Sequence, residues 1–254
     1  MMTFQQFMAT FPDEDACRRY LFERRWPDAK VKCPRCEKSE TVYPLKTMPW
    51  RWECSNPGCR SGNAYRFSLL VATVFEDTKI PLVTWFKVLY AMLQSKKGIS
   101  SRQVRRMFFG ETSSLHTAWY VCHRLRAAMR DAEFRQLMRI VEIDETYIGG
   151  KGKNRHKKDR FRGRGTVGKI SVIGAMARKG NIICQIIENT DTLTIDRYVR
   201  GQVQTQHIDS FWALLKRGIV GTYHNVSKKY LPLYLAEFQF RHNIATMRTS
   251  SDRQ

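Results

Sequence analysis

The chain has 254 residues, and 44 Lys and Arg residues against 23 Asp and Glu residues give it a formal net charge of +21. Such an excess favours polyanionic partners, while 43% hydrophobic and 12% aromatic residues exceed what short basic ribosomal proteins usually contain. No apolar run reaches the roughly 18 to 20 residues of a membrane span and no secretory leader opens the chain, so we expect a cytoplasmic nucleic-acid-binding protein.

A short helix is predicted between residues 10 and 30, ahead of a cysteine-rich region. Asp13 is a helix start signal, and the apolar face would carry Cys17, Tyr20 and Leu21. We expect this helix to pack against the domain that follows.

Seven cysteines divide into an ordered group of four and a scattered group of three. The ordered group forms a C-x2-C and a C-x4-C knuckle, separated by segments with the composition of short strands at 41–43 and 50–53. Two disulfides would need an oxidising compartment, which nothing else in the sequence supports. The spacing instead predicts a zinc ribbon with a structural zinc site formed by Cys33, Cys36, Cys54 and Cys59. The others are predicted to be packing residues: Cys17, Cys122 and Cys184.

Further helices are predicted after the ribbon. Residues 81–93 form a largely apolar pattern opened by a proline, and a punctuated pair follows at 98–110 and 113–129, with Ser100 as a cap and Gly110 as a stop. A helix-turn-helix could place the polar residues of the second member in a major groove: Thr117, Trp119, His123, Arg124, Arg126 and Arg130. An ordinary helical hairpin with a solvated basic face is the alternative.

Residues 141–151 combine a strand pattern, an acidic pair and the start of a Gly-rich basic run. The alternation at 138–143 predicts a strand that ends at Asp144 and Glu145. A carboxylate at a strand's end is well placed to hold a hard divalent cation, which makes Asp144 a candidate metal ligand. The alternative is that Asp144 is only a turn residue.

A basic loop and a hairpin are predicted next. Residues 149–169 hold nine Lys or Arg residues against one acid, so we expect a solvated loop that is either a plain linker or a phosphate-binding segment beside Asp144. Strand patterns at 169–178 and 181–189 are split by a good hairpin turn. With the strand at 140–144 they should form three antiparallel strands.

The chain resembles the ISXO-like group of bacterial insertion-sequence transposases. The resemblance rests on the zinc ribbon, the helical pair ending near TAWYVCHRLRAAMR, the motifs VEIDETYIGGK and GRGTVGK, and the block FWALLKRGIVGTYHNVSKKYLPLYLAEFQFRHN, and it covers nearly the whole chain. It implies a DDE-type, RNase H-like nuclease domain that cuts and joins double-stranded DNA with two divalent cations, Mg²⁺ or Mn²⁺. Asp144 falls on the family's first acidic position, and Lys216 on the lysine of the LLKRG helix.

The family's third acidic position lies at the start of that last block, where this chain reads QHID and places Asp209. Asp209 would ligate a cation through a shorter arm than the usual glutamate, and Gln206 replaces the usual asparagine. An acid favoured by the helix macrodipole is the alternative for Asp209. A solvated charge, rather than a phosphate contact, is the alternative for Lys216.

The family's second acidic position has no clear counterpart. The family places it at the end of a further strand, but only residues 191–208 separate the last predicted strand from Asp209. We interpret this short spacing as an in-frame internal deletion. Asp191 and Asp196 are the local replacements, although Asp191 also suits a helix cap and Asp196 would lie one turn inside that helix.

The expected architecture is mixed α/β (α+β) with three parts. Residues 1–68 would form an N-terminal helix and zinc ribbon, residues 69–135 a helical, helix-turn-helix-like DNA-binding segment, and residues 136–254 an RNase H-like core with a truncated sheet. Closing helices at 208–216 and 226–240 should pack on the sheet through Phe211, Trp212, Leu215, Tyr234, Leu235 and Phe238.

Two functions follow from the resemblance. One is a transposase that binds the terminal repeats of an insertion sequence and performs metal-dependent cleavage and strand transfer to target DNA, as a homodimer or higher assembly at the nucleoid. The other is a catalytically inactive remnant that only binds DNA. A zinc-ribbon transcription or RNA-processing factor would explain the cysteines and the charge but not residues 211–243.

Overall fold

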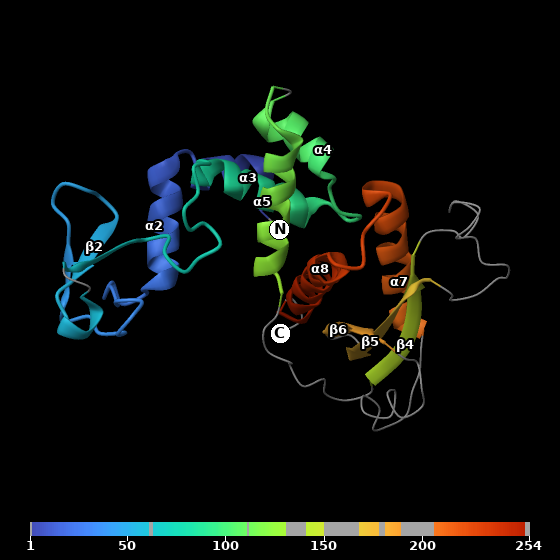
Figure 1. Ribbon diagram of the computed structural model, residues 1–254. Coiled ribbons are helices and arrows are strands. Elements are labelled where there is room, and N and C mark those ends of the chain that lie inside the picture. Colours follow the sequence, from blue (N-terminus) through green and yellow to red (C-terminus); the bar gives the residue numbers. More distant parts are fainter. Residues whose placement is uncertain are drawn as a thin grey trace. The chain divides into compact units, whose positions relative to one another are not determined.

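The computed structural model describes residues 2–60, 63–110, 112–130, 141–149, 168–177, 181–188 and 206–251. The chain forms two compact units, Met1–Tyr90 and Ala91–Gln254, and each contains helices and a three-stranded antiparallel sheet (Figure 1). The expected α+β class is therefore confirmed. Within the described ranges, no helix is both long and apolar enough to cross a membrane.

Two short helices open the first unit: α1 (Phe4–Thr10) and α2 (Glu14–Arg25). Asp13 caps α2, because its carboxylate accepts a hydrogen bond from the backbone N–H of Ala16 at 2.8 Å. α2 confirms the predicted N-terminal helix, whereas α1 has no counterpart among the predicted elements. Its sequence signal is a capping box, in which the side chains of Thr3 and Gln6 each accept a hydrogen bond from the other residue's backbone N–H.

The sheet of the first unit has the strand order β1 (Val42–Pro44), β2 (Arg51–Cys54) and β3 (Tyr65–Ser68), with a 3-10 turn, η1 (Pro57–Cys59), between the last two. Trp52 and Phe67 are register partners on β2 and β3, and both are buried. Phe22 of α2 and Trp26 at its C-terminal end pack on Trp52, with ring centroids 6.1 and 5.4 Å away. The predicted packing of the N-terminal helix on the ribbon is confirmed.

The helices that follow are α3 (Leu82–Gln94), α4 (Ser101–Val104) with its π-helical continuation η2 (Arg105–Phe109), and α5 (Leu115–Ala128). The predicted start and stop signals are confirmed. Ser100 Oγ accepts a hydrogen bond from Gln103 N at 3.2 Å and caps α4. Gly110 ends η2 with a φ of 76°, a left-handed conformation that glycine adopts without steric cost.

The second unit contains a sheet in the order β4 (Val141–Ile148), β5 (Ile170–Ala177) and β6 (Ile182–Ile187), and both strand pairs are antiparallel. Three antiparallel strands were predicted, and this is confirmed. The prediction that Asp144 and Glu145 end their strand is wrong, because the ladder continues to the pair Ile148 and Ile170. The apolar alternation persists beyond the acids, with Thr146 and Ile148 both buried. The predicted hairpin turn and most of the basic loop lie outside the described residues.

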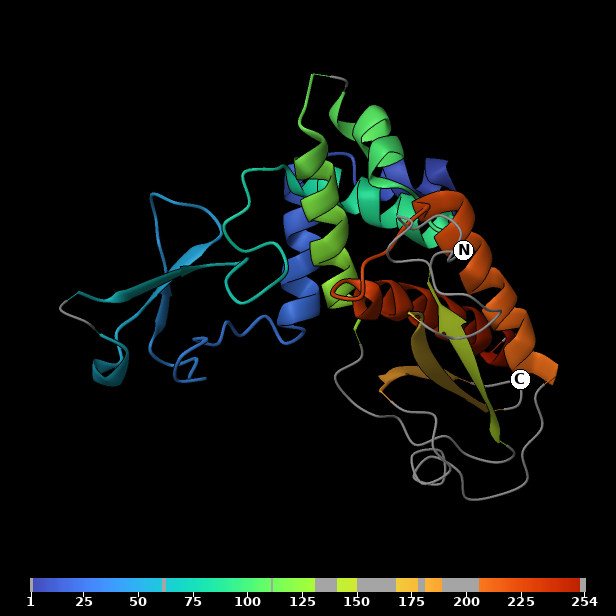
Figure 2. The same cartoon turned by 45° about the vertical axis from the view of Figure 1, so that its right-hand side comes forward.

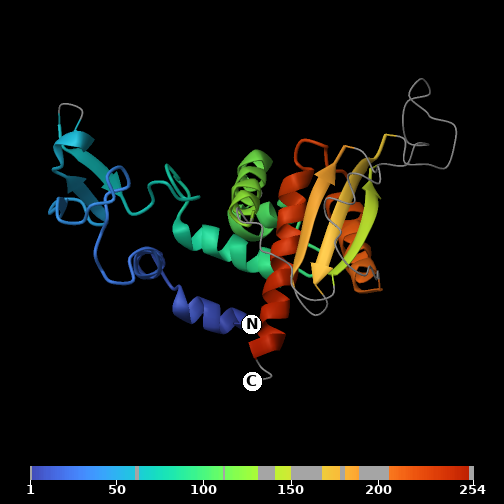
Figure 3. The same cartoon turned by 90° about the horizontal axis from the view of Figure 1, so that it is seen from below.

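Two helices cover one face of this sheet: α7 (Gln206–Gly218) and α8 (Leu231–Ser251), which the π-helical turn η5 (Ile219–Tyr223) precedes (Figure 3). Buried residues of both helices and the sheet form one core, which contains five of the six predicted packing residues: Phe211, Trp212, Leu215, Leu235 and Phe238. The sixth, Tyr234, is buried against the rings of His123 and Tyr223 instead. The second helix also begins later than the predicted residue 226.

α8 lies along β6, one of the two outer strands of the described sheet (Figure 3). The side-chain amide of Asn243 accepts a hydrogen bond from Ile182 N at 2.8 Å and donates one to Ile182 O at 3.1 Å. One turn earlier, Gln239 Oε1 accepts a hydrogen bond from Cys184 N at 3.1 Å. These two side chains therefore satisfy backbone groups that an edge strand would otherwise expose.

Candidate metal and nucleic-acid sites

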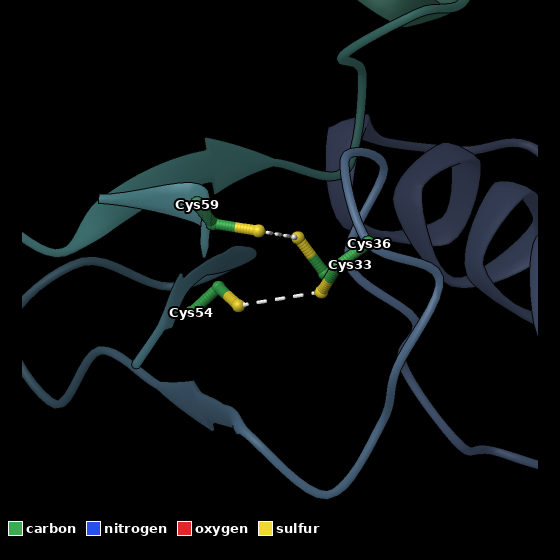
Figure 4. A group of neighbouring side chains, drawn as sticks. All are labelled: Cys33, Cys36, Cys54 and Cys59. Atoms are coloured by element: carbon green, nitrogen blue, oxygen red, sulfur yellow. Dashed lines mark hydrogen bonds between the residues drawn. The ribbon is translucent and has the colours of Figure 1, made fainter. Parts of the chain in front are cut away.

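The four ordered cysteines converge at one end of the ribbon sheet (Figure 4). Their Sγ atoms all lie within 4.8 Å of one another, with 3.9 Å between those of Cys33 and Cys59 and 3.8 Å between those of Cys36 and Cys54. A tetrahedral zinc site with Zn–S bonds of about 2.3 Å requires sulfur–sulfur separations of about 3.8 Å. The thiol cluster thus has the donor set and the dimensions of a structural zinc site, as the sequence predicts.

The thiols of this cluster have unequal acidities. The backbone N–H of Lys38 lowers the pKa of the Cys36 thiol to about 6, whereas burial raises the pKa of Cys59 to about 12. Zinc binds thiolates, so loading the site must displace protons from the buried members. Arg35 packs beside the cluster. Its Nη1 donates a hydrogen bond to the carbonyl oxygen of Cys59 at 3.0 Å, and its guanidinium lies 3.8 Å from the ring centroid of Tyr65.

The two candidate catalytic carboxylates lie on neighbouring elements. Asp144 lies in β4, opposite Gly174 of β5, and alternation along the strand places its side chain on the same face as Glu142 and Thr146. That face is the one covered by α7, since Ile148 on the same side belongs to the core shared with this helix. Asp209 lies in the first turn of α7 and is exposed.

Two close contacts join the start of α7 to the strands. Glu142 is fully buried, and its Oε2 accepts a hydrogen bond from Ile208 N at 3.1 Å. The side chains of Ile208 and Trp212 lie directly on the backbone of Gly174. Glu142 was not among the predicted site residues, although its position two residues before Asp144 in an alternating strand was a signal that the two side chains share a face.

Lys216 lies two turns beyond Asp209 on the same exposed stripe of α7. The structure therefore places both residues on one helix face, with Asp144 on the strand beneath. Among the described residues, only the cysteines form a group of three or more metal-binding side chains, so neither Asp144 nor Asp209 belongs to such a group there. Asp191 and Asp196 lie outside the described residues.

The predicted DNA-reading face of α5 requires a correction. His123 and Arg126 are only 7% and 0% exposed, so neither is available to a major groove. The reason is that α5 packs on α8 through a stripe that contains these two residues (Figure 2). The polar residues that remain accessible on and after α5 are His116, Thr117, Trp119, Tyr120, Arg124 and Arg130.

Arg126 belongs to a buried ionic network between α5 and α8. Its Nε lies 2.6 Å from Glu237 Oε2, and Glu237 also pairs with Arg241 at 2.9 Å and accepts a hydrogen bond from the Tyr223 hydroxyl at 3.0 Å. Burial alone would lower the pKa of Arg126, but the Glu237 carboxylate raises it above its ordinary value. Arg126 and Glu237 are 111 residues apart, so no local sequence pattern could predict this ion pair.

His123 lies in an aromatic enclosure between the same two helices. Its ring centroid is 4.0 Å from that of Trp119, 5.0 Å from Tyr230 and 5.5 Å from Tyr234. Neither ring nitrogen has a hydrogen-bond partner among the described residues. Burial and, to a lesser extent, the Arg126 charge lower the pKa of His123 to about 4, so the imidazole is neutral at physiological pH.

Tyr120 and Arg124 form the best-defined pair on the accessible side of α5. Tyr120 is 45% exposed, and Arg124 Nη1 donates a hydrogen bond to its hydroxyl at 3.0 Å. Exposed basic residues also occur on the preceding helix, at Arg102 of α4 and Arg106 of η2. Arginine beside an exposed aromatic ring is a suitable surface for phosphates and bases.

Two family models match separate parts of the chain. Residues 136–199 and 190–243 match the model of the ISXO2-like transposase domain, and residues 12–62 match that of the transposase zinc-ribbon domain. The first match consists of two segments that both include residues 190–199. No curated protein and no solved structure shows significant similarity to the chain.

Proposed function

Because this chain belongs to the ISXO2-like transposases, we propose that it binds the ends of an insertion sequence and cuts and joins DNA there through a divalent-metal site that includes Asp144 and Asp209. The observation that carries the proposal is the contact between β4 and the start of α7, which brings the strand of one candidate ligand against the helix turn of the other. This arrangement lies within the matched domain.

The proposed chemistry is in-line displacement at a phosphodiester by water or by a DNA 3′-hydroxyl. A bound Mg²⁺ or Mn²⁺ would lower the pKa of the attacking oxygen and stabilise the leaving oxygen. The carboxylates of Asp144 and Asp209 would hold the cation, and Lys216, two turns along the exposed stripe of α7, would contact a phosphate of the DNA. The zinc ribbon would contribute a folded module rather than chemistry.

The second acidic ligand decides between an active enzyme and a remnant. The division of the family match into two segments that share residues 190–199 supports our interpretation of an internal deletion before α7. Asp191, Asp196 or a second copy of the chain would then have to supply the missing carboxylate. Without it, the protein would be a catalytically inactive remnant that still binds DNA, which is the second candidate function.

For DNA recognition we propose the accessible side of α5, with Tyr120 and Arg124 at its centre. In this division of labour, residues 1–68 and 69–135 recognise the element ends, and residues 136–254 perform the chemistry. The net charge of +21 would add a sequence-independent attraction to the phosphates. Such a protein would act at the nucleoid, as a homodimer or larger assembly on paired ends.

The test is to incubate the zinc-loaded protein with its own flanking DNA and Mg²⁺ or Mn²⁺, and to measure binding, cleavage and joining. Asp144→Asn should abolish cleavage and leave end binding nearly intact. Binding without cleavage by the wild-type protein would identify the remnant, and a large loss of binding in Asp144→Asn would show that this carboxylate is structural.

The recognition surface has its own test. Arg124→Ala should weaken binding to the element end and reduce the salt dependence of the affinity by about one released counterion. Lys228→Ala is the matched control, because Lys228 is an exposed cation outside the segments proposed to recognise the element ends. Equal effects of both variants would contradict a specific role for α5.

A further inference from the structure

The first turn of α7 is capped by a side chain from a distant strand. Ile208 is the third residue of α7, and the backbone N–H groups of a helix's first turn have no partner inside the helix. Here the partner is Glu142 Oε2, from a strand residue 66 positions earlier in the chain, at 3.1 Å. A carboxylate in this position also complements the positive end of the helix dipole. The start of α7 is thereby tied to β4 itself.

We propose that Glu142 is a positioning residue, which holds the first turn of α7, and with it Asp209, against the strand that carries Asp144. The inference rests on the proposed metal site and adds a residue that binds neither metal nor DNA. Glu142 is fully buried and its Oε2 is engaged by Ile208, so it is distinct from the half-buried Asp144 and the exposed Asp209.

The two residues joined by this hydrogen bond lie close in sequence to the two candidate metal ligands. Asp209 follows the donor of the bond directly, and Asp144 lies two residues after the acceptor on the same face of β4. A single hydrogen bond therefore constrains the backbone of both candidate ligands. Metal sites depend strongly on such supporting contacts, and losing one typically weakens metal affinity by about 10- to 100-fold.

The same helix turn is also held by packing. Gly174 pairs with Asp144 in the ladder, and a Cβ atom at Gly174 would lie 3.1 Å from Ile208 Cδ1 and 2.5 Å from Trp212 Cζ2. The first turn of α7 thus rests on bare backbone next to Asp144 while its amide is held by Glu142. Polar and apolar contacts together allow little movement of Asp209 relative to Asp144.

The test measures Mn²⁺ affinity of the zinc-loaded full-length protein by calorimetry, together with hydrogen exchange of the peptide that covers residues 206–212. Glu142→Leu, which cannot accept a hydrogen bond, should weaken Mn²⁺ binding about tenfold or more and speed exchange in this peptide. Glu142→Gln keeps an acceptor oxygen in the same place and should remain close to wild type in both measurements.

The matched control is Asn243→Ala, which removes the hydrogen bonds to Ile182 at the other edge of the same sheet. It should lower the melting temperature without changing Mn²⁺ affinity. If Glu142→Leu weakens Mn²⁺ binding no more than Asn243→Ala does, the positioning role is overturned and the metal site stands. If Asp144→Asn binds Mn²⁺ as tightly as wild type, the metal site itself is overturned, and the positioning role with it.

Discussion

The two candidate metal sites of this protein are assembled in different ways. The zinc ligands come from two knuckles of one ribbon, and the four sulfur atoms gather within 4.8 Å. The two candidate catalytic acids of the described residues, Asp144 and Asp209, lie on a strand and on a helix. These elements are joined by a hydrogen bond between residues that are 66 positions apart in the sequence. Spacing alone therefore encodes the first site, whereas the second depends on how distant elements pack.

The largest expected effect is on the local site. Cys36→Ser should release zinc and unfold residues 31–60, because zinc binding contributes on the order of 10 kcal/mol to small domains of this kind. Metal analysis and hydrogen exchange would measure both changes. Cys17→Ala, which alters a buried cysteine outside the cluster, is the control and should retain zinc. Zinc retained at wild-type stoichiometry in Cys36→Ser would falsify the ribbon assignment.

The long-range contacts of the second unit are tested next by Glu237→Gln. This change leaves the fully buried Arg126 and the partly buried Arg241 without their carboxylate, and breaking a buried pair in this way costs about 3–5 kcal/mol. Arg126→Met is the informative comparison, since Glu237 keeps Arg241 and Tyr223 as partners and the loss should be smaller. Denaturant unfolding would measure both, and equal losses would contradict the proposed network.

The same contrast explains what could be predicted from the sequence. Short-range signals succeeded: the cysteine spacing, the Ser100 cap, the Gly110 stop and the strand alternation all depend on neighbouring residues. Long-range packing could not be predicted from the sequence, because Arg126 of α5 faces inward to pair with Glu237, which lies 111 residues later in the chain. An amphipathic basic helix is compatible with DNA on either side until its packing partner is known.

A third prediction concerns pH. The folded pKa of His123 is about 4, below its ordinary value of 6.5, so the unfolded chain takes up a proton at a higher pH than the folded protein does. The free energy of unfolding is therefore unaffected by His123 above about pH 6.5. It decreases as the pH falls from there towards 4, by at most about 1.4 kcal/mol per pH unit. Melting curves across this range should show the loss, and His123→Phe should flatten it. An unchanged slope in His123→Phe would assign the acid sensitivity to other groups.

The smallest expected change in stability falls where the start of α7 packs on the strands, at Gly174. Gly174→Ala places a Cβ 2.5 Å from Trp212 Cζ2, an overlap that should cost about 1–3 kcal/mol as α7 shifts away from β5. Gly221→Ala is the control, because no atom lies within 4 Å of its added Cβ. A shift of α7 moves Asp209 away from Asp144, so Gly174→Ala should weaken Mn²⁺ binding by more than its modest destabilisation suggests. Unchanged Mn²⁺ affinity would mean that the carboxylates tolerate this displacement and that the second site, like the zinc site, depends mainly on local structure.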